Sequence, residues 1–114
     1  MASVAYYYQQ IAKLNALKKR FIALQAALSA LVPDLKKASS FLKDATDGME
    51  VSYTVNEITA DNDSIKDNKE SIDSIASTIS GSVMPAISEK IRSIEAEISH
   101  YYELIRQAEA EENS

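Results

Sequence analysis

Residues 45–57 have the sequence ATDGMEVSYTVNE and lie between two segments whose apolar residues recur at helical spacing. Three interpretations are open: a short strand, a turn between two helices, or a degraded recognition motif. Every second residue from Met49 to Val55 is apolar or aromatic, which is a strand pattern. A lone strand would have no partner strand in this chain, however, whereas Asp47-Gly48 is a signal that commonly ends a helix. The stretch is therefore predicted to be the turn of a helical hairpin.

The segment before this stretch carries a long heptad pattern. Its apolar residues follow one another in alternating steps of three and four residues, which is the spacing of a coiled-coil seam. The seam consists of Leu14, Leu17, Phe21, Leu24, Leu28, Leu31, Leu35, Ala38, Leu42, Ala45 and Met49. This pattern predicts one long helix.

The segment after the stretch repeats the pattern less evenly. Its last part is apolar at Ile87, Ile91, Ile94, Ile98, Tyr101, Ile105 and Ala108. Before that, Ile58, Ile65, Ile72, Ile75 and Ile79 keep the period, but the interleaved positions are the polar Asp61, Asn68 and Ser82. A thin, partly polar seam lowers stability or marks where register is set, and we expect one of these two roles for the middle of the chain.

Proline and glycine interrupt the pattern at two places. The seam continues through Pro33 from Leu31 to Leu35, which favours a kinked helix over a helix end. At GSVMP, residues 81–85, Gly and Pro coincide with a change of heptad phase. This predicts a kink or a break with a new helix start near Pro85, and it leaves open a full loop that folds the last helix back.

The predicted fold is all-α, a long, kinked, antiparallel and coiled-coil-like helical hairpin in a single domain over residues 1–114. Helix one is expected at about 4–46, the turn at 46–49, and a second arm at about 50–112 with a break near 81–85.

The charge distribution supports the pairing of the two helical arms. Up to Gly48 there are seven basic and three acidic residues, a balance of +4, and after it five basic and fourteen acidic, a balance of −9, which together make the net −5. Segments of opposite sign are suited to lie against each other.

Composition excludes several classes of protein. With 46% hydrophobic and 25% charged residues the chain is expected to fold, and without Cys it has neither a disulfide framework nor a thiolate site. Its apolar runs are far shorter than the roughly 20 residues of a membrane span, and no leader pattern opens the sequence, so we expect a cytoplasmic protein without stable membrane insertion. Nucleic acid is not an expected partner, because the KKR cluster at 18–20 faces an acidic second half.

The residues needed for chemistry are missing from the sequence. His100 is the only histidine and lies off the seam, and the two glycines are too far apart to form a phosphate loop. The run DNDSIKDNKESI, residues 61–72, has Lys66 where a calcium loop requires Gly and Ile72 where it requires Glu. We therefore expect no enzyme, no catalytic residues, no cofactor and no metal.

Apolar residues also lie outside the seam, where a two-helix hairpin would leave them uncovered. They are Ile11, Ile22, Val32, Phe41, Val83, Tyr102 and the run Tyr6 to Tyr8. Exposed apolar groups on a helix often mark a partner helix. The sequence therefore predicts self-association or a complex with another protein, in a layer of three or four helices.

The chain resembles a known family in its length, its hairpin pattern, its lack of enzymatic residues and its opening run YYYQQIAKLNALKKRFIALQAAL, residues 6–28. It is similar to the small WXG-like helical proteins of Gram-positive bacteria, and within them to the YwqH-like group encoded beside LXG toxins of the type VII secretion system. The resemblance implies a helical hairpin that binds the long N-terminal helical domain of the toxin, keeps it soluble and helps present it for secretion.

The signature motifs of this family are only partly present. Thr46-Asp47-Gly48 stands where the family has Trp-x-Gly, so Gly48 is kept and the Trp is not. The family's export pattern, Tyr-x-x-x-Asp/Glu, is absent after the second helix and occurs only at Tyr53 and Glu57, just after the predicted turn. The resemblance thus implies that another member of the complex completes the export signal.

The expected function is a non-enzymatic adaptor or targeting chaperone that binds an LXG-type toxin, alongside a second small helical protein. The alternative is a self-associating coiled-coil scaffold, a homodimer or homotetramer with no secretory role. Whether the chain stays in the cytoplasm or leaves with the toxin is open. The partner-binding seam is predicted to be Leu14, Leu17, Phe21, Leu24, Leu28, Leu31, Leu35, Ile87, Ile91, Ile94, Ile98, Tyr101 and Ile105.

Overall fold

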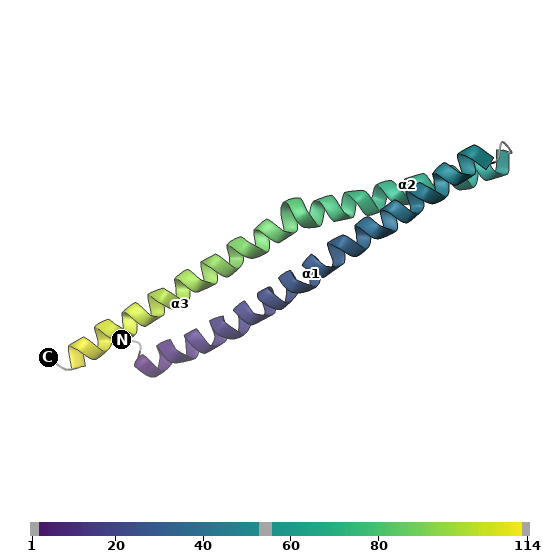
Figure 1. Ribbon diagram of the computed structural model, residues 1–114. Helices are drawn as coiled ribbons and strands as arrows, with labels where there is room; N and C mark the ends of the chain where they lie inside the picture. Colours follow the sequence, from purple (N-terminus) through teal and green to yellow (C-terminus); the bar gives the residue numbers. More distant parts are fainter. Residues whose placement is uncertain (1–2, 53–55, 113–114) are drawn as a thin grey trace. The chain divides into compact units, whose positions relative to one another are not determined.

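The computed structural model describes residues 3–52 and 56–112, and the side chains of residues 49–60 lie outside this description. Its elements are α1 (Val4–Ser52), α2 (Asn56–Thr78), the π-helix η1 (Ile79–Val83) and α3 (Met84–Glu112). All four are helices, and the described residues contain no strand. The predicted all-α helical hairpin is confirmed (Figure 1).

The chain divides into two compact units, residues 1–26 with 85–114 and residues 27–84. In the first unit the N-terminal part of α1 lies beside α3, and in the second the rest of α1 lies beside α2 (Figure 1). The single domain expected from the sequence stays a prediction. In a pair of helices each residue contacts only the residues opposite it. Contacts near one end of α1 therefore do not involve residues near its other end.

The start of α1 is capped by Ser3. The backbone N–H of Tyr6 donates to the Ser3 hydroxyl at 3.1 Å, and the N–H of Tyr7 donates to the Ser3 carbonyl at 3.2 Å. A serine hydroxyl at this position accepts one of the N–H groups that a helix start leaves without a partner. The predicted start of helix one near residue 4 is therefore correct.

The predicted turn at 46–49 is wrong, because α1 continues through Asp47 and Gly48 to Ser52. The described backbone has no glycine with positive φ, the conformation that a turn glycine would use. Local contacts hold these last turns in the helix. The Thr46 hydroxyl donates to the Lys43 carbonyl at 3.0 Å, and the Lys43 ammonium lies 3.2 Å from the Asp47 carboxylate. Of the predicted export motif, Tyr53 and the side chain of Glu57 lie outside the described residues.

The GSVMP stretch is neither a break nor a full loop. Residues 79–83 form a π-helix, and the Met84 N–H donates to the Ile79 carbonyl, so the backbone stays helical into α3. A π-turn takes in one extra residue, which accounts for the change of heptad phase noted in the sequence. Ile79, Val83, Ile87 and Ile91 are buried or half-buried and follow one another in three steps of four residues, and Met84 and Ser88 beside them are half-buried too. Pro85 is the second residue of α3, close to the predicted new start.

Pro33 lies inside α1 without ending it. The helix is continuous on both sides, as predicted, although proline removes one hydrogen bond and crowds the preceding turn. The Pro33 ring is exposed.

Candidate interaction surface

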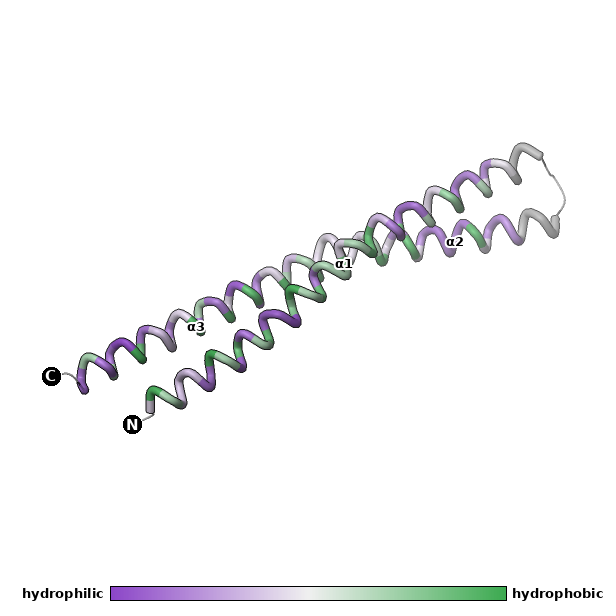
Figure 2. Tube along the Cα trace, turned by 60° about the horizontal axis from the view of Figure 1, so that its bottom comes forward, coloured by the Kyte–Doolittle hydropathy of each residue, from purple (hydrophilic) through white to green (hydrophobic). Residues whose placement is uncertain are grey.

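The first unit is held together by a seam of alternating three- and four-residue steps. Hydrophobic and hydrophilic positions alternate along the helices (Figure 2). On α3, Met84, Ser88, Glu103 and Leu104 are half-buried. The seam residues of α3, all buried or half-buried, are Ile87, Ile91, Ile94, Ile98, Tyr101, Ile105 and Ala108. These are the residues that the heptad pattern selects, and Ile94 is the most deeply buried of them.

The matching face of α1 is displaced from the predicted seam by one residue at every second position. Its buried or half-buried residues include Tyr7, Ile11, Leu14, Lys18, Phe21 and Gln25 in the first unit, and Leu28, Val32, Leu35, Ser39, Leu42 and Thr46 in the second. Val4, Gln10 and Ala45 of α1 are half-buried as well. Leu14, Phe21, Leu28, Leu35 and Leu42 are shared with the predicted seam. Their expected partners Leu17, Leu24 and Leu31 are exposed instead, at 37%, 46% and 41%.

Polar contacts across the helix pair account for this displacement in the first unit. Lys18 lies 3.6 Å from the Glu95 carboxylate, and the Gln25 amide donates to the Ser88 hydroxyl at 3.0 Å. Gln25 follows Lys18 by seven residues on α1, and Ser88 precedes Glu95 by seven residues on α3. The two contacts are therefore one heptad apart in an antiparallel helix pair. These two contacts turn the Lys18 and Gln25 side of α1, rather than the leucine side, toward α3.

A second polar cluster does the same in the other unit. The Ser39 hydroxyl, on a residue that is 7% exposed, donates to the Asp73 carboxylate of α2. The Lys69 ammonium donates to the other oxygen of that carboxylate at 2.7 Å. The hydrogen bond from Lys69, and to a smaller extent the one from Ser39, lowers the pKa of Asp73. Partial loss of hydration raises this pKa but does not outweigh them.

Burial along α2 follows this cluster. Ile75, predicted for the seam, is 51% exposed, whereas Ala76 beside it is buried. A shallow depression of about 290 Å³ lies here and is lined by Lys36, Asp73, Ala76, Ser77 and Ser80. Both oxygens of Asp73 already accept hydrogen bonds, so we assign the cluster to helix register and not to acid–base chemistry.

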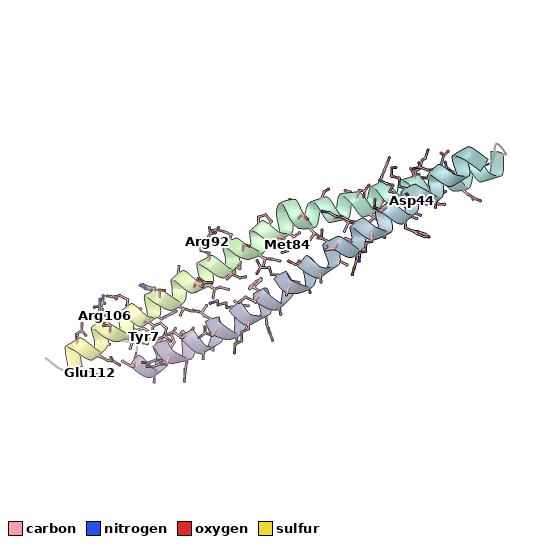
Figure 3. All side chains as sticks on the ribbon, in the orientation of Figure 1. Tyr7, Asp44, Met84, Arg92, Arg106 and Glu112 are labelled. Carbon is pink, nitrogen blue, oxygen red and sulfur yellow. The ribbon has the colours of Figure 1, made fainter. Side chains whose placement is uncertain are left out.

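Aromatic rings gather where α1 begins. Tyr7 extends from α1 toward α3 (Figure 3), and its ring centroid lies 5.9 Å from that of Tyr101. Tyr6 packs edge-on against Tyr7 at 6.0 Å, and His100 lies 6.2 Å from Tyr101. Tyr101 of the predicted partner seam is therefore engaged within the chain.

Arg92 and Arg106 of α3 point away from α1 (Figure 3), and both are paired locally. Arg92 donates to Glu89 at 2.9 Å, and Arg106 forms a two-bonded pair with Glu103. The bonds from Arg106 lower the pKa of Glu103, and the bonds to Glu103 raise the pKa of Arg106. Such exposed pairs contribute little to stability.

The predicted partner-binding residues thus fall into two groups. Leu14, Phe21, Leu28, Leu35, Ile87, Ile91, Ile94, Ile98, Tyr101 and Ile105 pack within the hairpin. Leu17, Leu24 and Leu31, all on α1 and seven residues apart, remain uncovered. Sequence reasoning missed the role of Lys18, Gln25 and Ser39. Together with Val32 and Thr46, these residues recur every seven positions along α1. That spacing was the signal in the sequence for a second possible seam on this helix.

No described helix has the length and apolar character needed to cross a membrane. Within the described part of the chain, no three His, Asp or Glu side chains are grouped so that they could hold a metal ion. A scan against models of protein families finds no match, and searches of curated proteins and of solved structures find no similar protein either.

Proposed function

We propose that this chain is a non-enzymatic helical adaptor that binds the N-terminal helical domain of an LXG-type toxin and targets it for type VII secretion. One observation carries the proposal. In a helix whose other face is already paired, Leu17, Leu24 and Leu31 are exposed at heptad spacing. Leucines spaced in this way are the means by which one amphipathic helix binds another.

The resemblance to the WXG-like proteins supplies the identity of the partner. A helix of the toxin domain laid along α1 would cover these leucines and remove their apolar surface from water. The same contact would shield the apolar stripe of the toxin helix before secretion. A second small helical protein in the complex would supply the export signal that this chain carries only in part.

The test is co-expression of the full chain with the N-terminal domain of the LXG-type toxin encoded nearest to it, followed by affinity capture and light scattering on a sizing column. We expect a stable complex of defined mass. The matched control is the C-terminal domain of the same toxin, which should not be captured. If neither domain forms a complex, the adaptor function is wrong.

The exposed leucines also favour a second candidate function, a self-associating coiled-coil scaffold. Leucines at heptad spacing bind a second copy of their own chain as readily as a foreign helix if the flanking charges allow it. A scaffold would show a concentration-dependent mass and a melting temperature that rises with its own concentration. An adaptor would show both effects with the toxin domain instead.

A further inference from the structure

We propose that the outer face of α1 between Lys13 and Leu24 binds an amphipathic helix whose apolar seam is flanked by Asp and Glu. The inference rests on the function proposed above and specifies the chemistry of the partner. The outer face is defined as Lys13, Ala16, Leu17, Arg20, Ala23 and Leu24, all of which are exposed and belong to the first unit.

These six residues form one continuous surface. Each is three, four or seven residues from its neighbours on the face, and side chains at those spacings lie on the same side of an α-helix. Leu17 and Leu24 supply the apolar contacts. Ala16 and Ala23 have short side chains, so the backbone of an incoming helix can approach closely between the longer ones.

The charge of this face determines what can bind it. Residues 1–26 contain four basic residues and no acidic one. Lys18 is turned into the seam toward Glu95, whereas Lys13, Lys19 and Arg20 are exposed and have no ion-pair partner in the described part of the chain. The α3 arginines, in contrast, are paired with Glu89 and Glu103. Uncompensated positive charge beside exposed leucines complements a helix with carboxylates beside its apolar seam.

Two other occupants fit less well. A second copy that met this face through the same face would bring Lys13 and Arg20 toward the same cations, which repel. An anionic lipid surface would be attracted by α1 but repelled by the neighbouring α3, which from residue 85 onward has seven acidic and three basic residues. An acidic amphipathic helix is narrow enough to contact α1 alone.

The test measures binding of the toxin's N-terminal domain to variants of the full chain. The apolar variant is L17S/L24S. Its control is Ile75→Ser, at an exposed isoleucine on α2. The charge variant is K13E/R20E, and its control is K36E/K37E, which makes the same change of net charge at two exposed lysines in the second unit. Far-UV circular dichroism establishes that each variant remains helical.

We expect L17S/L24S to weaken binding by at least about tenfold and I75S to leave it within about twofold. K13E/R20E should also weaken binding, and its effect should shrink as NaCl rises from about 50 to about 500 mM, because salt screens surface charge. Unchanged binding by L17S/L24S, or equal loss by K13E/R20E and K36E/K37E, would overturn the assigned face while leaving the adaptor function intact. Failure of the unmodified chain to bind would overturn the adaptor function itself.

Discussion

At Ser39 a hydroxyl group lies between two helices and connects them. It is nearly buried on α1 and donates to Asp73 on α2, whose second oxygen accepts from Lys69. A serine is an unfavourable residue for a helix interior, since its hydroxyl competes for backbone hydrogen bonds. Its place in the seam is explained by the cross-helix bond, which selects one register of α1 against α2.

Ser39→Ala is therefore expected to lower the free energy of unfolding. Loss of the bond to Asp73 should outweigh the gain of about 0.5 kcal/mol in helix propensity and leave a net loss of about 1 kcal/mol. The control is Ser40→Ala, on the exposed side of the same helical turn, which should show only the propensity gain. Urea unfolding measures both, and a stabilised Ser39→Ala protein would contradict this role.

The lowered pKa of Asp73 makes part of the stability depend on pH. A carboxylate whose pKa is lower in the folded than in the unfolded chain stabilises the fold above its ordinary pKa of 3.8. That contribution is lost as the pH falls below 3.8 through the folded value. The difference in unfolding free energy between the unmodified chain and Asp73→Asn should therefore have its largest value at about pH 7 and should decline below pH 3.8. A difference that stays constant to acid pH would rule out the carboxylate's role.

At the scale of the element, the end of α1 depends on contacts that a turn signal does not reveal. Asp47-Gly48 lies within the helix and not beyond it, with Lys43, Thr46 and Asp47 joined by side-chain contacts one turn apart. A glycine inside a helix costs about 1 kcal/mol relative to alanine. The described structure has open space where a Cβ at Gly48 would lie.

Gly48→Ala should accordingly stabilise the protein by up to about 1 kcal/mol and raise its helical signal in far-UV circular dichroism. If Gly48 occupied a turn with positive φ, the same change would be destabilising. The sign of the measured change in melting temperature thus separates the two placements of this residue.

The two prolines should respond differently to replacement because of where they lie in their helices. Pro33 is well inside α1, where alanine would restore a backbone hydrogen bond, so Pro33→Ala is expected to stabilise by about 1–3 kcal/mol. Pro85 is the second residue of α3, directly after the π-turn, and Pro85→Ala should change stability much less. If chemical unfolding showed equal changes in stability for the two variants, the position of each proline within its helix would not explain its effect.

At the scale of the whole molecule, little apolar surface is fully covered. Among the described residues the buried apolar ones are Ile11, Ala76, Ile79, Ile87, Ile94 and Ile105. A helix paired on one side leaves most of its circumference in water. Stability in globular proteins comes mainly from buried apolar area, so this chain alone should be less stable than a compact domain of its length.

We expect a free energy of unfolding of no more than about 5 kcal/mol for the isolated chain. The toxin's N-terminal domain should raise it by about 2.7 kcal/mol at a free concentration one hundred times its dissociation constant. Melting curves over a dilution series, with and without the domain, measure both quantities. High stability that is independent of either concentration would contradict a partner-dependent fold.

The sequence by itself determined the fold class. Heptad spacing identified the helices, the opposite charges of the two halves indicated their pairing, and Ile87 to Ile105 were placed in the packed face of α3. These features follow from local periodicity, which depends only on the spacing of residues along one helix. The phase change near Gly81 was also visible in the sequence, although its physical form, a π-turn, was not.

Only the tertiary structure decided which side of α1 is packed. Leu14, Phe21, Leu28 and Leu35 have leucines on one flank and Lys18, Gln25, Val32 and Ser39 on the other, so apolar content alone favours the leucine side. The facing residues Glu95, Ser88 and Asp73 reverse that choice, because each offers a polar partner that a leucine could not use. These contacts join residues more than thirty positions apart in the chain, so the periodicity of one helix cannot reveal them. They leave Leu17, Leu24 and Leu31 exposed.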